Sequence, residues 1–476
     1  MRGQIGLFFL SVGFSRGVQC GASDPPFYLA ADPAYTIVDS VLDSLRFTLN
    51  RTLTTCDRGH IVSKASFLDT EGEVMEWHDF GKLEGPGWAA NSLGGAYEIH
   101  RWGGFLGEED WRTTALGILD HVLDHGFIDY ETGFISGYRN IATGKMVLNY
   151  QNDSDWFCPG SMAKNAFQLL LLSDELEGDT RCERMRNAAV RCAEWIATHL
   201  EEVPNGWFAR RCTPSGKIYR MSPNGGEDPF WQTSGDSVFT VQLQVELTRR
   251  GLADYRKEIA GRIEVFMEKG GFFASSNHDT YDKRENVVYA VAFRTLLAAA
   301  DLLESPEIRR FAFDKCLKGL DRFKIREDRN GVKTQGLLYM EKSWDTSYFW
   351  ENAESSLAYF EAAAAIRDPS PEEARQDELD GLTILRAVAK HHYGPHGFLT
   401  EGVDWNNHVG QKHHVDGALF GAIRYTEPFL NNQHIAEPTL FYLERLARTQ
   451  VENRKTEWLD CEGNLLLRQA VRSGTE

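Results

Sequence analysis

The sequence lacks several features that would place it in large classes of proteins. Beyond its first 20 residues no apolar run approaches the roughly 20 residues of a membrane-spanning helix. No long run of lysine or arginine occurs and the formal net charge is −18, so a nucleic-acid partner is not expected. The eight cysteines form no CxxC pair and no evident Cys/His cluster, which predicts neither structural zinc nor a disulfide framework. We therefore expect no membrane span, no metal and no other cofactor.

The first 20 residues form the one apolar stretch that requires a separate explanation. MRGQIGLFFLSVGFSRGVQC carries an arginine, then an apolar run, and ends near small residues that suit a cleavage site. We predict a signal peptide over residues 1–20, a single catalytic domain over 21–476, and a secreted or periplasmic location. A buried N-terminal segment is the structural alternative.

Helical periodicity recurs in pairs along the rest of the chain. Apolar residues three and four apart predict these helices: 35–53, 89–102 with 109–125, 160–176 with 181–201, 234–249 with 252–269, 286–303 with 306–323, 348–367 with 372–392, and 414–428 with 437–449. Repetition at this scale is typical of helical arrays. Such hairpins either stack as an open solenoid or close into a ring.

The connections between the pairs favour the ring. The two helices of a pair are joined by short turns, whereas long aromatic and glycine-rich segments separate successive pairs. One of these segments, TGFISGYRN, alternates in polarity and predicts part of a β-hairpin. We therefore predict an all-α (α/α)6 toroid of helical hairpins, with short β-hairpins in the loops between pairs.

An acidic residue and a tryptophan recur just before the first helix of several pairs. WDTSYFWENAESS (344–356) has this composition, and it recurs in NDSDWF, GGEDPFWQTSGDS and EGVDWNNHV. In a ring these helix starts lie at one end and converge on one cleft. Tryptophan faces stack on sugar rings, while carboxyls bind hydroxyls and carry out acid–base chemistry. For each acid taken alone, capping of a helix N-terminus is the simpler explanation.

The candidate site residues follow from this pattern. A glycosidase needs one carboxyl kept protonated by burial and one kept ionised. The catalytic candidates are Asp155, Asp236, Glu354 and Asp345. The candidates for substrate binding are Trp88, Trp156, Trp231, His278, Arg284, Trp350, Asp404, Trp405 and His413. A metal site at His413 and Asp416 would need a distant third ligand.

These segments together resemble the six-hairpin glycosidases, which include the unsaturated glucuronyl and rhamnogalacturonyl hydrolases. The stretch WDTSYFWENAESSLAYFEAAAAI is similar to the family motif in which D-T-S precedes an inner helix, here Asp345, Thr346 and Ser347. The resemblance implies the (α/α)6 fold and places the catalytic aspartates at Asp155 and Asp236. Trp350, Glu351 and Glu354 depart from the small residues usual in that helix. The N-acylglucosamine 2-epimerase family shares the ring and uses loop histidines, which His278 and His413 resemble.

The leading hypothesis is a glycoside hydrolase that acts on a poly- or oligosaccharide, with uronate-containing chains among the candidate substrates. Its acid would be Asp155 or Asp236, with a second carboxyl or water completing the attack. A polysaccharide lyase or sugar epimerase, using tyrosine or histidine, is the alternative. A helical array that binds glycans without turnover is the third hypothesis.

Overall fold

The computed structural model describes residues 27–75, 80–87, 91–151, 154–222, 225–274, 282–394, 397–450 and 457–468. The predicted signal peptide at residues 1–20 lies outside these ranges. No helix among the described residues has the length and apolarity required to span a bilayer.

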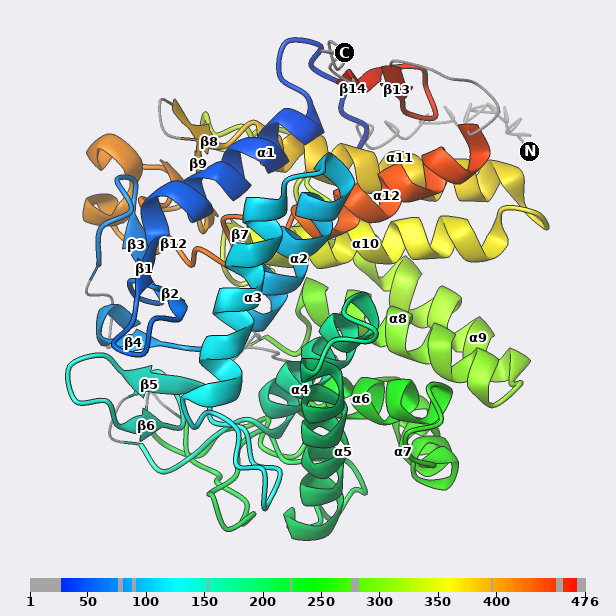
Figure 1. The fold of residues 1–476 in the computed structure, drawn as a ribbon. Coiled ribbons are helices and arrows are strands. Elements are labelled where there is room, and N and C mark those ends of the chain that lie inside the picture. Colours follow the sequence, from blue (N-terminus) through cyan, green and yellow to red (C-terminus); the bar gives the residue numbers. More distant parts are fainter. Residues whose placement is uncertain are drawn as a thin grey trace, which may run out of the picture.

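Six helices form a closed inner ring (Figure 1). Each packs against the next in chain order, and the last returns to the first. Because an outer helix runs back between successive members, the inner helices are parallel and their N-termini share one end. The inner helices are α2 (Asn91–Leu106), α4 (Pro159–Glu175), α6 (Val238–Arg249), α8 (Asn286–Leu302), α10 (Phe349–Ile366) and α12 (Ala436–Gln450).

An outer layer of helices covers this ring. Each outer helix packs on the inner helix that precedes it, so α2 pairs with α3 and α10 pairs with α11. The outer helices that follow an inner one are α3 (Glu109–Asp124), α5 (Arg181–His199), α7 (Arg256–Glu268), α9 (Pro306–Phe311, continued by a π turn and a 3-10 turn to Phe323) and α11 (Pro371–Ala389). The predicted (α/α)6 toroid is confirmed.

The sixth hairpin joins the two ends of the described chain. Helix α1 (Ile37–Phe47) packs against α12, although nearly the whole ring separates them in sequence. The predicted partner of α12, a helix over 414–428, is wrong. Asp416, Gly417 and Gly421 have φ values of 57°, 66° and 131°, which a helix excludes, and the segment instead forms 3-10 turns and short strands.

Short β-ladders lie in the loops between the helix pairs. β4 (Leu83–Glu84), β5 (Tyr138–Asn140) and β6 (Met146–Val147) form one antiparallel sheet, which confirms the hairpin predicted from TGFISGYRN. β7 (Thr346–Tyr348), β10 (Gly402–Asp404) and β11 (Gly421–Ala422) form another beside the start of α10. The remaining ladders pair β1 (Leu53–Thr55) with β2 (Ile61–Ser63), β3 (Leu68–Asp69) with β12 (Tyr425–Thr426), β8 (His392–Tyr393) with β9 (Phe398–Leu399), and β13 (Glu457–Leu459) with β14 (Leu465–Arg468).

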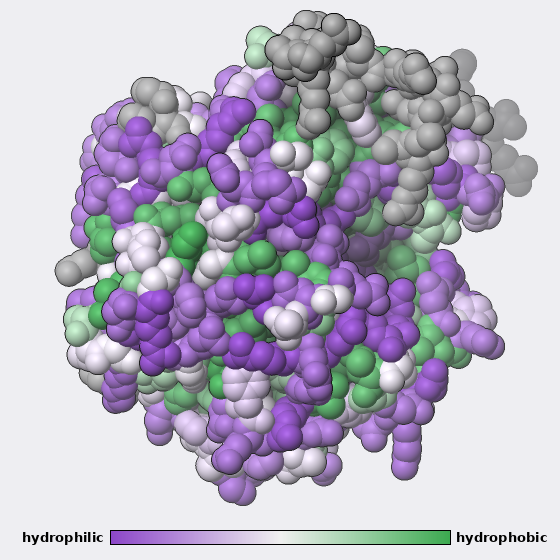
Figure 2. Space-filling model, in the orientation of Figure 1, coloured by the Kyte–Doolittle hydropathy of each residue, from purple (hydrophilic) through white to green (hydrophobic). Residues whose placement is uncertain are grey.

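The hydrophobic core fills the space between the two layers of helices. Residues such as Leu169, Leu170 and Phe293 on inner helices are fully buried against outer-helix residues such as Ala189. The inner helices are buried on nearly every face, because the outer layer covers one side and the ring axis the other. The molecular face in Figure 2 is mainly hydrophilic, with apolar residues scattered over it.

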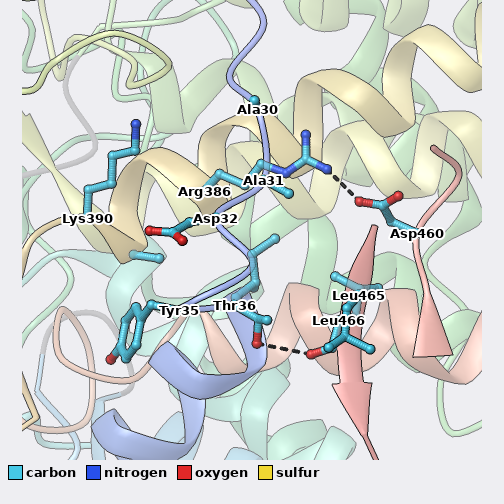
Figure 3. Close-up of a pocket in the computed structure, with 12 residues that line it drawn as sticks. Ala30, Ala31, Asp32, Tyr35, Thr36, Arg386, Lys390, Asp460, Leu465 and Leu466 are labelled. Carbon is cyan, nitrogen blue, oxygen red and sulfur yellow. Dashed lines mark hydrogen bonds and ion pairs between the residues drawn. The ribbon is translucent and has the colours of Figure 1, made fainter. Parts of the chain in front are cut away.

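The segments that precede α1 and follow α12 meet on the outer rim. Arg386 of α11 pairs with Asp460 at 2.5 Å, and the Thr36 hydroxyl donates to the Leu466 carbonyl at 3.1 Å (Figure 3). These contacts border a small cavity of about 50 Å³, and none of its lining residues lies on an inner helix. The cavity therefore belongs to the closure of the ring rather than to its axis.

Candidate active site at the ring axis

Glu354 of α10 is the centre of a buried ion network at the axis of the ring. Lys164 Nζ of α4 donates to its Oε1 at 3.1 Å, and Arg294 Nη1 of α8 donates to its Oε2 at 2.6 Å. His434 Nε2, just before α12, lies 3.3 Å from Oε1. Burial would raise the pKa of Glu354, but Lys164, Arg294 and His434 hold that pKa well below its usual range. Glu354 is therefore an ionised carboxylate that links four inner helices or their leading residues.

Glu98 of α2 extends this network to a fifth inner helix. His434 Nδ1 lies 2.7 Å from Glu98 Oε1, and Gln433 Nε2 donates to Oε2 at 2.8 Å. Burial raises the pKa of Glu98 to about 7 despite these contacts. Although burial alone would lower the pKa of His434, its hydrogen bonds to Glu354 and Glu98 raise it to about 10. His434 is therefore an imidazolium at neutral pH, a form that can donate a proton but cannot accept one.

Asp236, in the segment that leads into α6, is a further buried carboxyl. Its Oδ2 accepts the Ser161 backbone N–H at 3.0 Å and its Oδ1 accepts the Ser161 hydroxyl at 3.4 Å. These contacts cap the first turn of α4. Burial raises the pKa of Asp236 to about 7, although the Ser161 hydrogen bond, Arg210 and Lys164 act to lower it. Asp236 thus holds its proton under mildly acidic conditions.

Lys164 connects the two carboxyls. It lies three residues after Ser161 on α4, so both face the same side of the helix. It pairs with Glu354 directly and also influences the pKa of Asp236. Two of the predicted catalytic residues are thus within the electrostatic influence of one lysine, and their pKa values are displaced in opposite directions.

The other predicted acids lie in the loops at the N-terminal end of the ring. Asp155 is exposed just before α4. Asp345 is half-buried and accepts from Asn406 Nδ2 at 3.2 Å. Asp404 is fully buried and accepts the Val409 backbone N–H at 2.9 Å. The arrangement makes Asp404 a residue that orders its own loop, while Asp155 is open to solvent.

Most of the predicted tryptophans are packed into the protein. Trp156, Trp350 and Trp405 are 1%, 2% and 3% exposed, so their rings have almost no face open to solvent. Trp350 lies under Lys164, whose Nζ is 5.2 Å from the ring centroid. Trp231 is half-buried, with Arg220 over its ring at 4.3 Å, and sugar stacking on it stays a prediction.

Of the remaining predicted binding residues, two are described by the structure and two are not. His413 is half-buried edge-on to Tyr425, and burial with Lys412, Arg424 and His414 lowers its pKa, so it is a neutral imidazole. Arg284 is exposed just before α8. Trp88 and His278 lie outside the described residues.

Several buried amide and hydroxyl side chains of the inner helices have oxygens without a hydrogen-bond partner within the described parts of the chain. These oxygens belong to Asn91, Asn165, Gln168, Gln242, Gln244 and Thr295. A buried polar atom without a partner costs about 1–3 kcal/mol, so such atoms need bound water or a ligand. They come from four inner helices, and Gly94 leaves room beside Gln168, since a Cβ there would lie 3.6 Å from its amide. The inner helices therefore carry buried hydrogen-bonding groups of the kind that hydroxyl-rich ligands use.

The ring axis also holds one group with the donor set of a metal site. Atoms of Glu98, His434 and Glu437 lie within 4.8 Å of one another. Both nitrogens of His434 already face carboxylates, and Arg294 lies 4.0 Å from Glu437. The observed arrangement is that of an ion-pair network, in which the cations are supplied by the protein.

The residues that sequence reasoning missed are Glu98, Lys164, Arg294 and His434. A lone charged residue in an apolar helix was the available signal, as in SMAKNAFQLLLL and VVYAVAFRTLLAAA. Lysine and arginine are almost never fully buried unless they are paired. Each of these helices therefore indicates a buried ion pair, although the sequence does not identify the partner.

No protein-family model matches the chain, and no curated protein matches it. Solved structures with the same fold include cellobiose 2-epimerase from Spirochaeta thermophila DSM 6192, with a TM-score of 0.58 and 13% identity over 87% of this chain and 96% of that one. Cellobiose 2-epimerase from Bacillus thermoamylovorans B4167 has a TM-score of 0.57 and 13% identity, over 85% of this chain and 99% of that one. A family 76 glycoside hydrolase from a bovine Bacteroides thetaiotaomicron strain has a TM-score of 0.51 and 13% identity, over 85% of this chain and 77% of that one. The chain therefore has the (α/α)6 toroid fold found in these sugar epimerases and this glycoside hydrolase.

Proposed function

We propose that the chain is a carbohydrate-active enzyme, specifically a glycoside hydrolase, that works at the ring axis. The observation that carries this proposal is the pair of buried carboxyls, Asp236 and Glu354, whose pKa values are displaced in opposite directions. Hydrolysis of a glycosidic bond needs one carboxyl that donates a proton and one that stays ionised. The unpartnered amide oxygens of the inner helices support a substrate rich in hydroxyl groups.

In this proposal Asp236 donates a proton to the departing sugar oxygen. Glu354 remains ionised and stabilises positive charge at the anomeric carbon or directs the attacking water. Lys164 and Arg294 fix the Glu354 carboxylate, so little reorganisation is needed during the reaction. Access to the axis is from the N-terminal end of the inner helices, where the predicted loop residues Asp155, Asp345 and Trp231 lie.

The first test is an activity panel on the purified protein. Neutral and uronic polysaccharides and unsaturated oligosaccharides are followed by a reducing-end assay and by ultraviolet absorbance. We expect new reducing ends without a rise in absorbance. A rise in absorbance would instead establish a lyase, because elimination creates a double bond.

The second test separates the catalytic role of Asp236 from its capping role. Asp236→Asn keeps the shape of the side chain and its acceptor for Ser161 but cannot donate a carboxyl proton. We expect kcat to fall about 10²-fold or more, the lower end of general acid catalysis, with stability nearly unchanged. Glu354→Gln should reduce kcat as strongly.

The matched control for these variants is Asp129→Asn. Asp129 caps the backbone N–H groups of Glu131 and Thr132 in an outer turn, so it shares the capping chemistry without a place at the axis. A kcat for Asp236→Asn equal to that of this control would show that Asp236 only caps α4 and would remove it from the proposed mechanism.

A sugar epimerase is the second candidate, because His413 is a neutral, half-buried imidazole in the loop after β10. A neutral imidazole is suited to proton abstraction. Interconversion of sugar epimers in product NMR, without new reducing ends, would identify the reaction as epimerisation. Loss of that interconversion in His413→Gln would assign the base.

A secreted or periplasmic location also remains a proposal, since it rests on the apolar run within residues 1–20. N-terminal sequencing of protein recovered from the culture medium or the periplasm tests it. Cleavage close to Cys20 supports export, whereas an intact N-terminus on protein held inside the cell contradicts it.

A further inference from the structure

Four metal-binding side chains meet on the outside of the ring, at the C-terminal end of α3. Cys56 follows β1, His60 precedes β2, and His121 and His125 lie one turn apart at the end of α3. One ligand atom from each lies within 4.8 Å of the others. None of these residues lies on an inner helix, so the group is separate from the proposed active site.

The geometry of the four side chains suits a single small cation. The Sγ atom of Cys56 lies 3.4 Å from His125 Nε2. The ring of His125 is 4.3 Å from that of His121 and 5.3 Å from that of His60, measured between centroids. Ligands held at 2.0–2.3 Å in a tetrahedral zinc site are about 3.5 Å apart. The four groups therefore need only small adjustments to surround one ion.

The outer nitrogens of two histidines face carboxylates. His121 Nε2 lies 2.8 Å from Glu84 Oε2, in β4, and His60 Nε2 lies 3.8 Å from Asp124 Oδ2. In both residues Nδ1 is buried and has no hydrogen-bond partner within the described residues, and His121 is only 1% exposed. A carboxylate on one nitrogen and a free second nitrogen is the arrangement found in metal-ligating histidines.

Two arginines near the group are already engaged elsewhere. Arg58 Nη1 donates to the Asp124 carbonyl at 2.7 Å, and Arg139 Nη1 lies 3.5 Å from Glu84 Oε1. Their positive charges are therefore directed at the outer oxygens and not at the space between the four ligands. That space is bounded by one thiol and three imidazoles, a donor set that suits zinc.

We propose that Cys56, His60, His121 and His125 bind one zinc ion in a closed structural site. Four protein ligands complete a tetrahedron and leave no position for a substrate. Binding replaces the Cys56 thiol proton, which passes to solvent, with a zinc–thiolate bond. The ion would fasten the β1–β2 turn to the end of α3 and, through Glu84, to the β4–β5–β6 sheet.

This Cys/His group was not predicted from the sequence, because its members are far apart along the chain. The ligands occur as C-x3-H at 56–60 and H-x3-H at 121–125, two short pairs separated by 60 residues. The i, i+4 histidine pair places both rings on one face of α3. Only the packing of β2 against α3 brings the pairs together.

The test uses the full-length protein, stripped with a chelator and dialysed against metal-free buffer. Titration with Zn²⁺ should load one ion per chain, measured by plasma emission spectroscopy. Titration with Co²⁺ should give the strong visible bands of a tetrahedral site and a thiolate-to-cobalt charge-transfer band. Zinc should also raise the thermal midpoint.

Three variants assign the ligands and the supporting carboxylate. Cys56→Ser should abolish the charge-transfer band, and His121→Gln should weaken zinc binding strongly. Glu84→Gln should weaken it by about 10- to 100-fold, as expected for a group that only orients a ligand. Cys461→Ser and His199→Gln, which change a half-buried cysteine and an exposed histidine elsewhere, should bind zinc as the wild type does.

Two results would overturn the proposal. The first is folded wild-type protein that binds neither zinc nor cobalt. The second is zinc binding that is unchanged in both Cys56→Ser and His121→Gln. If a variant fails to fold, the cobalt spectrum of the wild type still decides the outcome.

Discussion

His434 is the residue whose charge the fold alters in the most testable way. It lies between Glu98 and Glu354, which raise its pKa from 6.5 to about 10. The folded state therefore keeps a proton that the unfolded state releases between about pH 6.5 and pH 10. The stabilisation is fully present below pH 6.5 and is lost as the pH rises towards 10.

We predict that the free energy of unfolding falls with pH across this window in the wild type and falls much less in His434→Gln. Urea unfolding at a series of pH values measures both slopes. His199→Gln is the control, because that histidine is exposed. Parallel slopes for wild type and His434→Gln would contradict the assignment of an imidazolium at the axis.

Single residues also show where sequence reasoning ends. Glu354 and Asp236 were predicted as site residues from their position beside aromatics at helix starts, and both are buried. Their partners were not predicted, because Lys164 is 190 residues from Glu354 and Ser161 is 75 residues from Asp236. Such pairs depend on ring closure, which local periodicity does not encode. The same local pattern placed Trp156 and Trp405 among sugar contacts, whereas both are buried.

At the scale of the helices, the junction between α4 and the segment leading into α6 is the tightest contact near the site. A Cβ on Gly160 would lie 2.1 Å from the Asp236 carbonyl oxygen and 2.4 Å from its Oδ2. The nearest of these atoms is backbone and cannot rotate away. Gly160→Ala must therefore separate α4 from this segment and displace Asp236.

We predict that Gly160→Ala lowers the free energy of unfolding by about 2–3 kcal/mol, as overpacking does, and reduces activity with it. Gly261→Ala in α7 is the matched control, since a Cβ there meets nothing within 4 Å and alanine favours a helix by up to about 1 kcal/mol. Urea unfolding measures both. Equal stability of the two variants would show that α4 and this segment are not held as tightly as described.

The helix pairs were largely predictable because each pair is a local feature. Apolar spacing over 160–176 and 181–201 matches α4 and α5 closely, since both helices bury one face within a single hairpin. The segment 414–428 failed because its periodicity is accompanied by residues in left-handed conformations, notably Gly417 and Gly421. The pairing of α1 with α12 was not predicted, because no local signal connects such distant segments.

At the scale of the whole molecule, Arg386 of α11 fastens the two ends of the described chain, because its Nη1 donates to the Leu29 carbonyl at 2.9 Å and its Nη2 pairs with Asp460. The side chains of Arg386 and Asp460 are 4% and 0% exposed and lie 2.5 Å apart. Removing one member of a buried pair costs about 3–5 kcal/mol. Glu462 also pairs with Arg386 at 3.3 Å and retains part of the compensation.

We therefore predict that Asp460→Ala lowers the free energy of unfolding by about 3 kcal/mol. Glu462→Gln, which changes a more exposed partner of the same arginine, should change it by about 1 kcal/mol or less. Chemical denaturation measures both variants. A loss for Asp460→Ala no larger than that for Glu462→Gln would show that this pair does not hold the ring closed.

The packing of α1 on α12 has a consequence for biosynthesis. A ribosome makes α1 long before α11 and α12, so the emerging helix lacks these two partners while most of the ring is translated. The entropy of closing so large a loop rises only with the logarithm of its length, so the finished ring loses little stability by this design. The consequence is instead kinetic, because α1 completes its packing only after α12 has been made.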